Sequence, residues 1–122
     1  MESGELVIFV LYLVVGVALV GLGVPLLMTW VPPNPLYGFR TPRTLQDPEV
    51  WYAVNRTTGF WLIVTGVVAG GVAISTFAAG LGLPVAPLLN LTPVILGVTA
   101  MIAHGTLVGR KIMGTREERK AE

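Results

Sequence analysis

The sequence predicts an all-α integral membrane protein with three transmembrane helices, the second preceded by a helical extension at the membrane surface. Of its 122 residues, 53% are hydrophobic and 12% are charged, and the mean hydropathy is +0.75, which is too apolar for an ordinary soluble domain. Two long blocks carry no charge. Because a bilayer requires each backbone group to be paired within its own segment, we expect helices, and a single membrane domain over 1–122.

The first uncharged block runs from Leu6 to Met28. At 1.5 Å per residue it would extend roughly 34 Å, enough to cross a hydrocarbon core of about 30 Å. It follows an acidic amino terminus and is longer than the apolar part of a secretory signal. We therefore predict a retained transmembrane helix over about 6–29, which Trp30 and the prolines that follow it would end at the interface.

The second uncharged block, Thr57–Gly109, contains 53 residues without Asp, Glu, Lys or Arg. Glycines and prolines between 80 and 91 indicate a turn, which divides the block into helices over about 57–79 and 92–112. The charged tail at 113–122 is expected to be a solvated helix end or disordered.

Start signals refine two of these boundaries. Asp47 as an N-cap, Pro48 in the first helical position and Glu49 in the first turn predict that the second helix begins ahead of the bilayer. Thr92, followed by Pro93, is the expected cap of the third helix.

The polar segment at 30–56 separates the two blocks and holds the residues that form a recognisable motif. They are Asn34, the run Tyr37-Gly38-Phe39-Arg40-Thr41-Pro42, Thr44, Trp51 and the pair Asn55-Arg56. This string resembles the signature of the SdpI family, small integral membrane proteins of bacteria and archaea named for an immunity protein against a secreted toxin. The resemblance extends over the three apolar segments. It implies binding, immunity or signalling toward a membrane-active peptide or toxin, with a cytoplasmic regulator as a further partner.

Three arginines of the segment are candidates for recognition. A guanidinium stays charged and makes two-pronged contacts to carboxylate or phosphate, so Arg40, Arg43 and Arg56 could bind lipid headgroups, an anionic solute or a peptide carboxylate. The alternative is topological anchoring together with pairing to Asp47 and Glu49, and it is the favoured interpretation for Arg43. The family positions favour ligand contact for Arg40 and Arg56, and we expect the Arg40 guanidinium to lie beside Asn55 and Trp51.

The remaining motif side chains have two interpretations. They bind a ligand directly, or they cap and pin a loop whose backbone lies close to the bilayer. The tryptophans Trp51 and Trp61 are more often interfacial anchors than a binding cage. With the arginines and the histidine below, the candidate ligand-binding residues are Asn34, Tyr37, Arg40, Thr41, Thr44, Trp51, Asn55, Arg56 and His104.

His104 is the only ionisable residue expected inside the last two spans. If the third helix begins near Thr92, the imidazole lies roughly 16 Å along the axis and near mid-bilayer. Such a residue either serves a functional site or forms a hydrogen bond between helices, with Thr65, Ser75, Thr76 or Thr99 as expected partners. A single histidine supplies one ligand where a metal needs three or four, so we expect no metal site. We also expect no cofactor and no enzymatic activity, because no acid pair, phosphate loop or nucleophile beside a base can be placed.

Charge placement predicts orientation in the plasma membrane. All eight Lys and Arg residues lie within 40–56 and 110–120, which share one side of a three-helix protein. The positive-inside rule therefore puts the amino terminus outside and the carboxyl terminus in the cytoplasm. Membrane lipids are expected partners and nucleic acid is not.

Glycine pairs predict close helix packing. Gly66 and Gly70, like Gly105 and Gly109, are four residues apart and would let helices approach each other, within the hairpin or between copies of the chain. Three helices enclose almost no interior, so a transport path would require a homo-oligomer. A small oligomeric transporter or channel for an ion or small solute, with a path past His104, is the alternative function.

Overall fold

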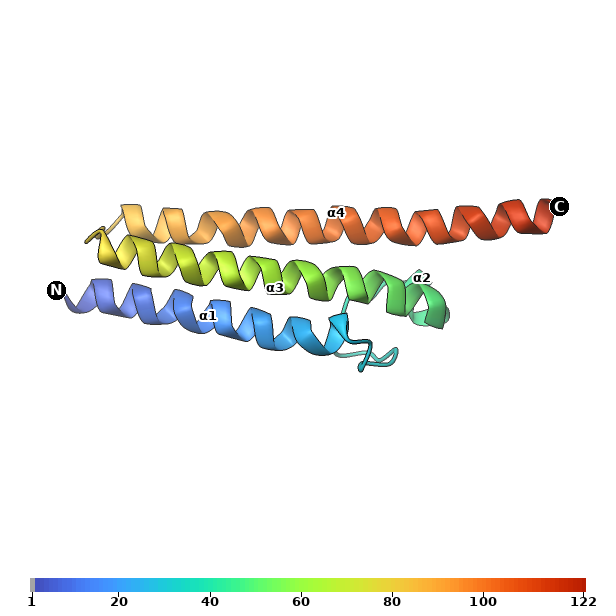
Figure 1. The fold of residues 1–122 in the computed structure, drawn as a ribbon, viewed down its shortest axis with the longest axis horizontal. Helices are drawn as coiled ribbons and strands as arrows, with labels where there is room; N and C mark the ends of the chain where they lie inside the picture. Colours follow the sequence, from blue (N-terminus) through green and yellow to red (C-terminus); the bar gives the residue numbers. More distant parts are fainter. Residues whose placement is uncertain (1) are drawn as a thin grey trace.

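The computed structural model describes residues 2–122, which fold into three long helices and one short helix (Figure 1). The helices are α1 (Ser3–Leu27), α2 (Pro42–Gln46), α3 (Pro48–Ala78) and α4 (Val85–Ala121). The three long helices are each long and apolar enough to cross a membrane. The prediction of an all-α, multi-pass membrane protein with three spans is confirmed.

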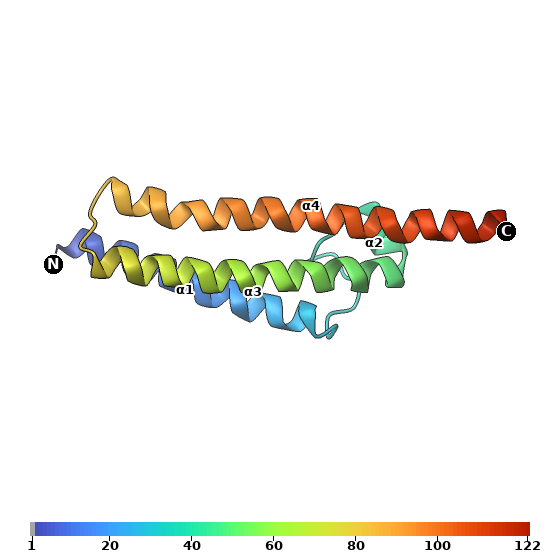
Figure 2. The ribbon, with the colours of Figure 1, turned by 45° about the horizontal axis from the view of Figure 1, so that its top comes forward.

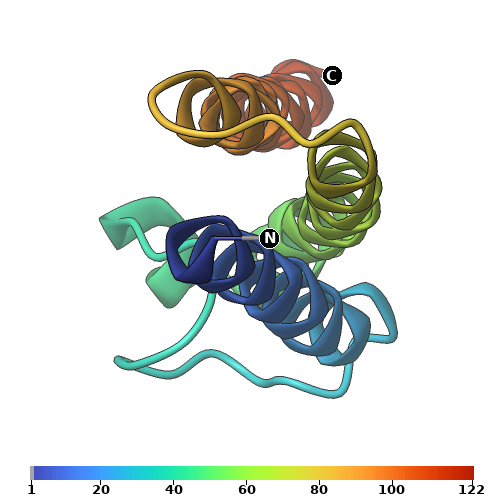
Figure 3. The ribbon, with the colours of Figure 1, turned by 90° about the vertical axis from the view of Figure 1, so that its left-hand side faces the viewer.

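Helix α3 is the centre of the arrangement. It packs on one side against α1 and on the other against α4, whereas α1 and α4 hardly touch each other. Seen from the end, the three helices follow an arc with α3 in the middle, and the short α2 packs against α3 at one end of the bundle (Figures 2 and 3). One contact between the outer helices is the Tyr12 hydroxyl, which donates a hydrogen bond to the Pro87 carbonyl at 3.4 Å.

Glycines bring α1 and α3 into backbone contact. A Cβ atom added at Gly16 would lie 2.8 Å from the Gly66 carbonyl oxygen, and one added at Gly23 would lie 2.7 Å from the Gly59 carbonyl oxygen. These two crossings leave no room for a side chain. Gly66 therefore serves packing within the chain, as expected, but its partner is α1 rather than the following helix.

The α3–α4 seam uses different small residues. Gly97 faces Thr65, where an added Cβ would overlap the threonine side chain. Gly105 and Gly109 sit over Val54 in ordinary van der Waals contact, so this glycine pair does pack within the hairpin as expected. Close approach maximises dispersion contacts between helices in lipid, where the hydrophobic effect does not drive association.

The predicted start of the second long helix is confirmed. Asp47 is the N-cap of α3, and its side-chain Oδ1 accepts a hydrogen bond from the Glu49 amide at 3.0 Å. Pro48 occupies the first turn, where its missing donor is not needed. α3 extends without interruption from this cap to Ala78, and its C-cap Ala79 is followed by Gly80, which has φ +67°.

The predicted start of the third helix is wrong. α4 begins at Val85, so Thr92 and Pro93 lie inside the helix, and the Thr92 hydroxyl donates to the Leu88 carbonyl at 2.8 Å instead of capping. The physical reason is a tertiary contact, because the Asn90 amide donates to the Thr76 hydroxyl at 2.9 Å and fixes this earlier turn against α3. At the other end α4 continues to Ala121, so the tail is a helix end.

Candidate functional site

The loop between α1 and α2 folds back onto α3 and is fixed there by an asparagine. The Asn55 side-chain oxygen accepts a hydrogen bond from the Phe39 amide at 2.6 Å, and its nitrogen donates to the Trp51 carbonyl at 3.1 Å. Asn55 is only 2% exposed. Its amide thus satisfies backbone groups of the loop and of its own helix in a place that water does not reach.

Trp51 fixes an earlier part of the same loop. Its indole nitrogen donates to the Val31 carbonyl at 2.8 Å, and the residue is completely buried at 0% exposure. The expectation that Trp51 is an interfacial anchor is therefore wrong. The ring is the largest fully buried side chain of the protein. It is buried because the loop covers this face of α3.

Gly38 lies where the loop comes closest to these two residues. Its φ is +116°, a conformation that side chains resist, and an added Cβ would lie 2.7 Å from Asn55 Oδ1. The same Cβ would lie 3.1 Å from the Trp51 ring. A glycine is required at this position for both reasons.

Asn34 and Tyr37 stabilise the first half of the loop. The Asn34 side-chain oxygen accepts hydrogen bonds from the amides of Leu36 and Tyr37 at 3.0 and 2.8 Å. The Tyr37 hydroxyl donates to the carbonyl of Leu22 in α1. Burial raises the pKa of Tyr37, so the hydroxyl stays protonated and remains a donor at neutral pH.

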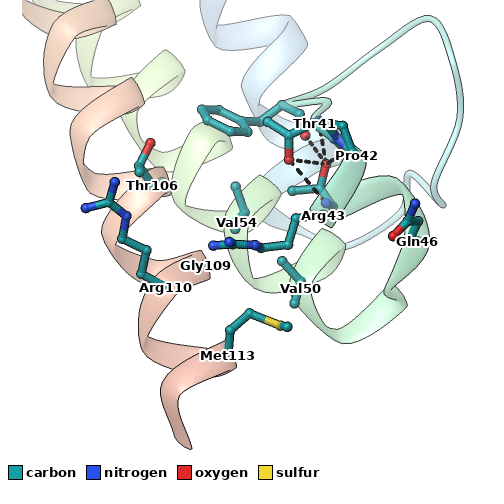
Figure 4. A pocket seen from close by; sticks show the side chains of 13 residues that line it. Thr41, Pro42, Arg43, Gln46, Val50, Val54, Thr106, Gly109, Arg110 and Met113 are labelled. Carbon is teal, nitrogen blue, oxygen red and sulfur yellow. Dashed lines mark hydrogen bonds between the residues drawn. The ribbon is translucent and has the colours of Figure 1, made fainter. Parts of the chain in front are cut away.

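Thr41 and Thr44 build the start of α2. The Thr44 amide donates to the Thr41 hydroxyl at 3.2 Å, and the Thr41 amide donates back to the Thr44 hydroxyl at 2.8 Å, which is a reciprocal capping box. The Thr44 hydroxyl also lies 3.0 Å from the Phe39 carbonyl, to which it donates, and the residue is 2% exposed. Both threonines are used by the backbone, and Figure 4 shows these bonds as dashed lines.

The loop arginines lie elsewhere. The Arg40 guanidinium donates to the Pro35 carbonyl and the residue is exposed, so the backbone ahead of Arg40, rather than its side chain, occupies the place beside Asn55 and Trp51. Arg56 is exposed on α3. The expected pairing of the loop arginines with Asp47 and Glu49 is also wrong, because Arg116 from the α4 extension bonds both carboxylates.

His104 lies farther from the start of its helix than predicted. It is 19 residues beyond the start of α4, which at 1.5 Å per residue is about 28 Å along the axis instead of the roughly 16 Å expected. Its Nδ1 accepts a hydrogen bond from the indole nitrogen of Trp61 at 3.0 Å. Of the two alternatives, the structure shows the hydrogen bond between helices, although the partner is none of the four expected residues.

A pocket of about 570 Å³ opens at the same end of the bundle, between α2, α3 and α4 (Figure 4). Val50 and Val54 of α3 line the pocket, and on α4 it is lined by Gly109, which has no side chain. Arg43 from α2 and Arg110 from α4 lie on opposite sides. The pocket also includes Phe39, Thr41, Pro42, Thr44, Gln46, Gly105, Thr106 and Met113.

The comparison with protein families gives the assignment. The family model described as the SdpI/YfhL protein family matches residues 31–109. The chain belongs to the SdpI/YfhL protein family. No curated protein and no solved structure matches the chain.

The SdpI-family match begins after α1 and ends just before Arg110, whereas the resemblance was expected to extend over all three apolar segments. The match contains the loop at 31–41, α2, α3 and the apolar part of α4. Within it the structure brings together Asn34, Tyr37, Thr41, Thr44, Trp51 and Asn55 as supports of one loop, and leaves Arg40, Arg56 and His104 apart from them.

Sequence reasoning missed the pocket arginines as a pair. Arg43 was interpreted as an anchor, and Arg110 only as one of the cations at 110–120 that set the orientation. The spacing of Gly105 and Gly109, with a cation directly after them, was the one available signal. It does not predict α2 as the opposite wall, because that depends on how the loop folds.

Proposed function

We propose that this SdpI-family protein is a non-enzymatic binding protein of the plasma membrane that recognises an amphipathic, membrane-active peptide, in an immunity or signalling role. One observation carries the proposal. Six motif side chains are used to hold the loop at 31–46 in one conformation, so the loop is a fixed surface and the residues on its outside are free for a partner.

That outer surface combines apolar and cationic groups. Leu36 is 85% exposed and Trp30 is 66% exposed, although both belong to a well-packed segment. In the sequence Arg40 lies between these two residues and α2. Its guanidinium donates to one loop carbonyl, so other N–H groups of its five remain available to a partner. Apolar side chains beside a fork of donors match a peptide with an apolar face and a carboxylate.

Arg40 provides the sharpest test of recognition. Lysine keeps the positive charge but loses the planar fork. If Arg40 binds a carboxylate, Arg40→Lys should reduce peptide binding nearly as much as Arg40→Ala while insertion and folding persist. A residue that only sets topology would tolerate lysine fully.

The experiment uses the full chain in lipid nanodiscs with a panel of amphipathic antimicrobial peptides, together with survival of peptide-treated cells that express it. Leu36→Ser is the apolar variant of the loop. Leu83→Ser is its matched control, because Leu83 is 71% exposed at the opposite end of the bundle. Loss of binding and protection with Leu36→Ser alone supports the proposal, and equal behaviour of both variants contradicts it.

The proposed orientation places the loop and the carboxyl terminus in the cytoplasm and the amino terminus outside. The chain has no native cysteine, so single cysteines can be labelled without background. Leu36→Cys and Leu83→Cys are both well exposed and lie on opposite sides of the membrane in this orientation. An impermeant reagent added to intact cells should label the cysteine at 83 only, and labelling at 36 alone would reverse the orientation.

Transport is the second candidate. The observation in its favour is that His104 is exposed on the surface of the helix bundle, where a second copy of the chain could cover it. Saturable flux of ions or small anions through proteoliposomes that contain the purified protein, abolished by His104→Ala, would favour transport over peptide binding.

A further inference from the structure

We infer that the pocket between α2, α3 and α4 is a binding site for the headgroup of an anionic phospholipid, whose phosphate Arg43 and Arg110 bind while its acyl chains lie in the surrounding bilayer. The inference is independent of the proposed function, because the pocket lies on the α4 side and includes neither Leu36 nor Arg40.

The charge of the pocket is uncompensated. Among residues 2–122, Arg43 and Arg110 form no hydrogen bond and no ion pair, whereas Arg116 nearby on α4 bonds two carboxylates. None of the lining residues is acidic. Two arginines from two different helices line one space, and guanidinium groups are suited to bind the oxygens of a phosphate.

The interior of the pocket is apolar. Val50 and Val54 are 0% and 1% exposed and form part of its wall. Gly105 and Gly109 form the part on α4, where they are buried against Val54, so this apolar wall of the pocket is closed. The acyl chains of a bound lipid would therefore lie outside this wall, in the surrounding bilayer, and the headgroup would occupy the pocket.

The depth of the pocket corresponds to the headgroup region. Arg110 is the first charged residue after the uncharged stretch Thr57–Gly109, so the pocket has its cationic part at the membrane boundary and its apolar part below. Lipid surrounds the protein at this depth and competes with every other ligand at high local concentration. Basic pockets between transmembrane helices are known to take anionic headgroups, and two uncompensated charges select an anionic lipid over a zwitterionic one.

The test measures lipid retention by native mass spectrometry of the purified full chain, titrated with phosphatidylglycerol or with phosphatidylcholine of identical acyl chains. Wild type should retain phosphatidylglycerol in preference. Arg43→Gln with Arg110→Gln should weaken phosphatidylglycerol retention by roughly tenfold or more, since each basic group contributes to attraction of anionic lipid. Melting temperature and gel filtration confirm that the variant folds.

The matched control is Arg40→Gln with Arg56→Gln, which removes the same charge from exposed positions outside the pocket. It should keep the preference for phosphatidylglycerol. Equal losses in the two double variants would overturn the site in favour of general charge attraction, and no loss in the pocket variant would overturn it outright.

Two further arms identify the occupant. Glycerol phosphate, which has the headgroup chemistry without acyl chains, should fail to displace the lipid at equal concentration, and displacement would overturn the lipid assignment. If the pocket variant loses peptide binding and keeps its lipid preference, the pocket belongs to the peptide, and the lipid assignment is overturned while the proposed function stands.

Discussion

The side-chain amide of Asn55 pairs with both backbone groups of Phe39, accepting from its N–H at 2.6 Å and donating to its carbonyl at 3.4 Å. One residue of α3 therefore mimics a strand partner for a loop that has no secondary structure at that point. This pairing connects the loop at 31–41 to the helix bundle.

Replacing Asn55 with alanine should release the loop. The Phe39 amide would lose its partner in a buried place, so we expect a loss of about 1–3 kcal/mol in unfolding free energy and faster proteolysis within 31–46. The matched control is Thr57→Ala, because the Thr57 hydroxyl bonds only the Ala53 carbonyl of its own helix. Thermal melting in detergent and limited proteolysis measure both, and equal melting temperatures for the two variants would contradict the role of Asn55.

Alanine at Gly38 should be more damaging than alanine at Gly80. Both glycines have positive φ, +116° and +67°, so both substitutions introduce backbone strain of about 1–3 kcal/mol. Only at Gly38 does the added Cβ also meet a neighbour, since no atom lies within 4 Å of a Cβ at Gly80. The melting temperature should fall further for Gly38→Ala, and the reverse order would show that the loop adapts to a side chain.

Alanine at Gly59 and at Gly71 should change stability in opposite directions. At Gly59 the new Cβ overlaps the backbone of α1, so the α1–α3 seam must open at a cost of about 1–3 kcal/mol. At Gly71 no atom lies within 4 Å, and alanine favours the helix by roughly 0.5–1 kcal/mol. Melting of the two variants under identical detergent conditions gives the comparison. Destabilisation by Gly71→Ala would reveal a partner on that face.

Asp47 combines two roles that can be separated. Asp47→Asn keeps the capping oxygen and removes the charge that pairs with Arg116, so it should cost about 0.5 kcal/mol for one partly exposed pair, and less than Arg116→Gln, which also removes the pair with Glu49. Asp47→Ala should cost about 1 kcal/mol more because the cap is lost. Melting at low and high salt measures this, since only the ion-pair part is screened. A salt-insensitive difference between wild type and Asp47→Asn would contradict the assignment.

The sequence was sufficient where a structural feature depends on neighbouring residues. The cap at Asp47, the proline after it and the uncharged length of each span determine where α3 begins and how many helices cross the membrane. The turn that Asn34 forms is equally local. Its side chain caps the loop backbone, which is one of the two roles predicted for it.

Features that depend on contacts between distant segments were missed. Trp51 is buried because a loop twenty residues earlier covers it, and no pattern within α3 indicates that cover. The start of α4 depends on the bond between Asn90 and Thr76, and the error there shortened the expected distance from the start of the helix to His104. Arg43 and Arg110 share a pocket only because the helix order and register bring α2 beside α4.

The unbroken course of α4 has a consequence for any reporter attached to the carboxyl terminus. At 1.5 Å per residue the helix from Val85 to Ala121 is about 55 Å long, well beyond the hydrocarbon thickness of about 30 Å. Its last turns are therefore a rigid arm outside the bilayer, held near the start of α3 through Arg116. A fluorescent protein joined directly after Ala121 would inherit the tilt of α4, so that its polarisation in an oriented membrane reports the angle of the helix.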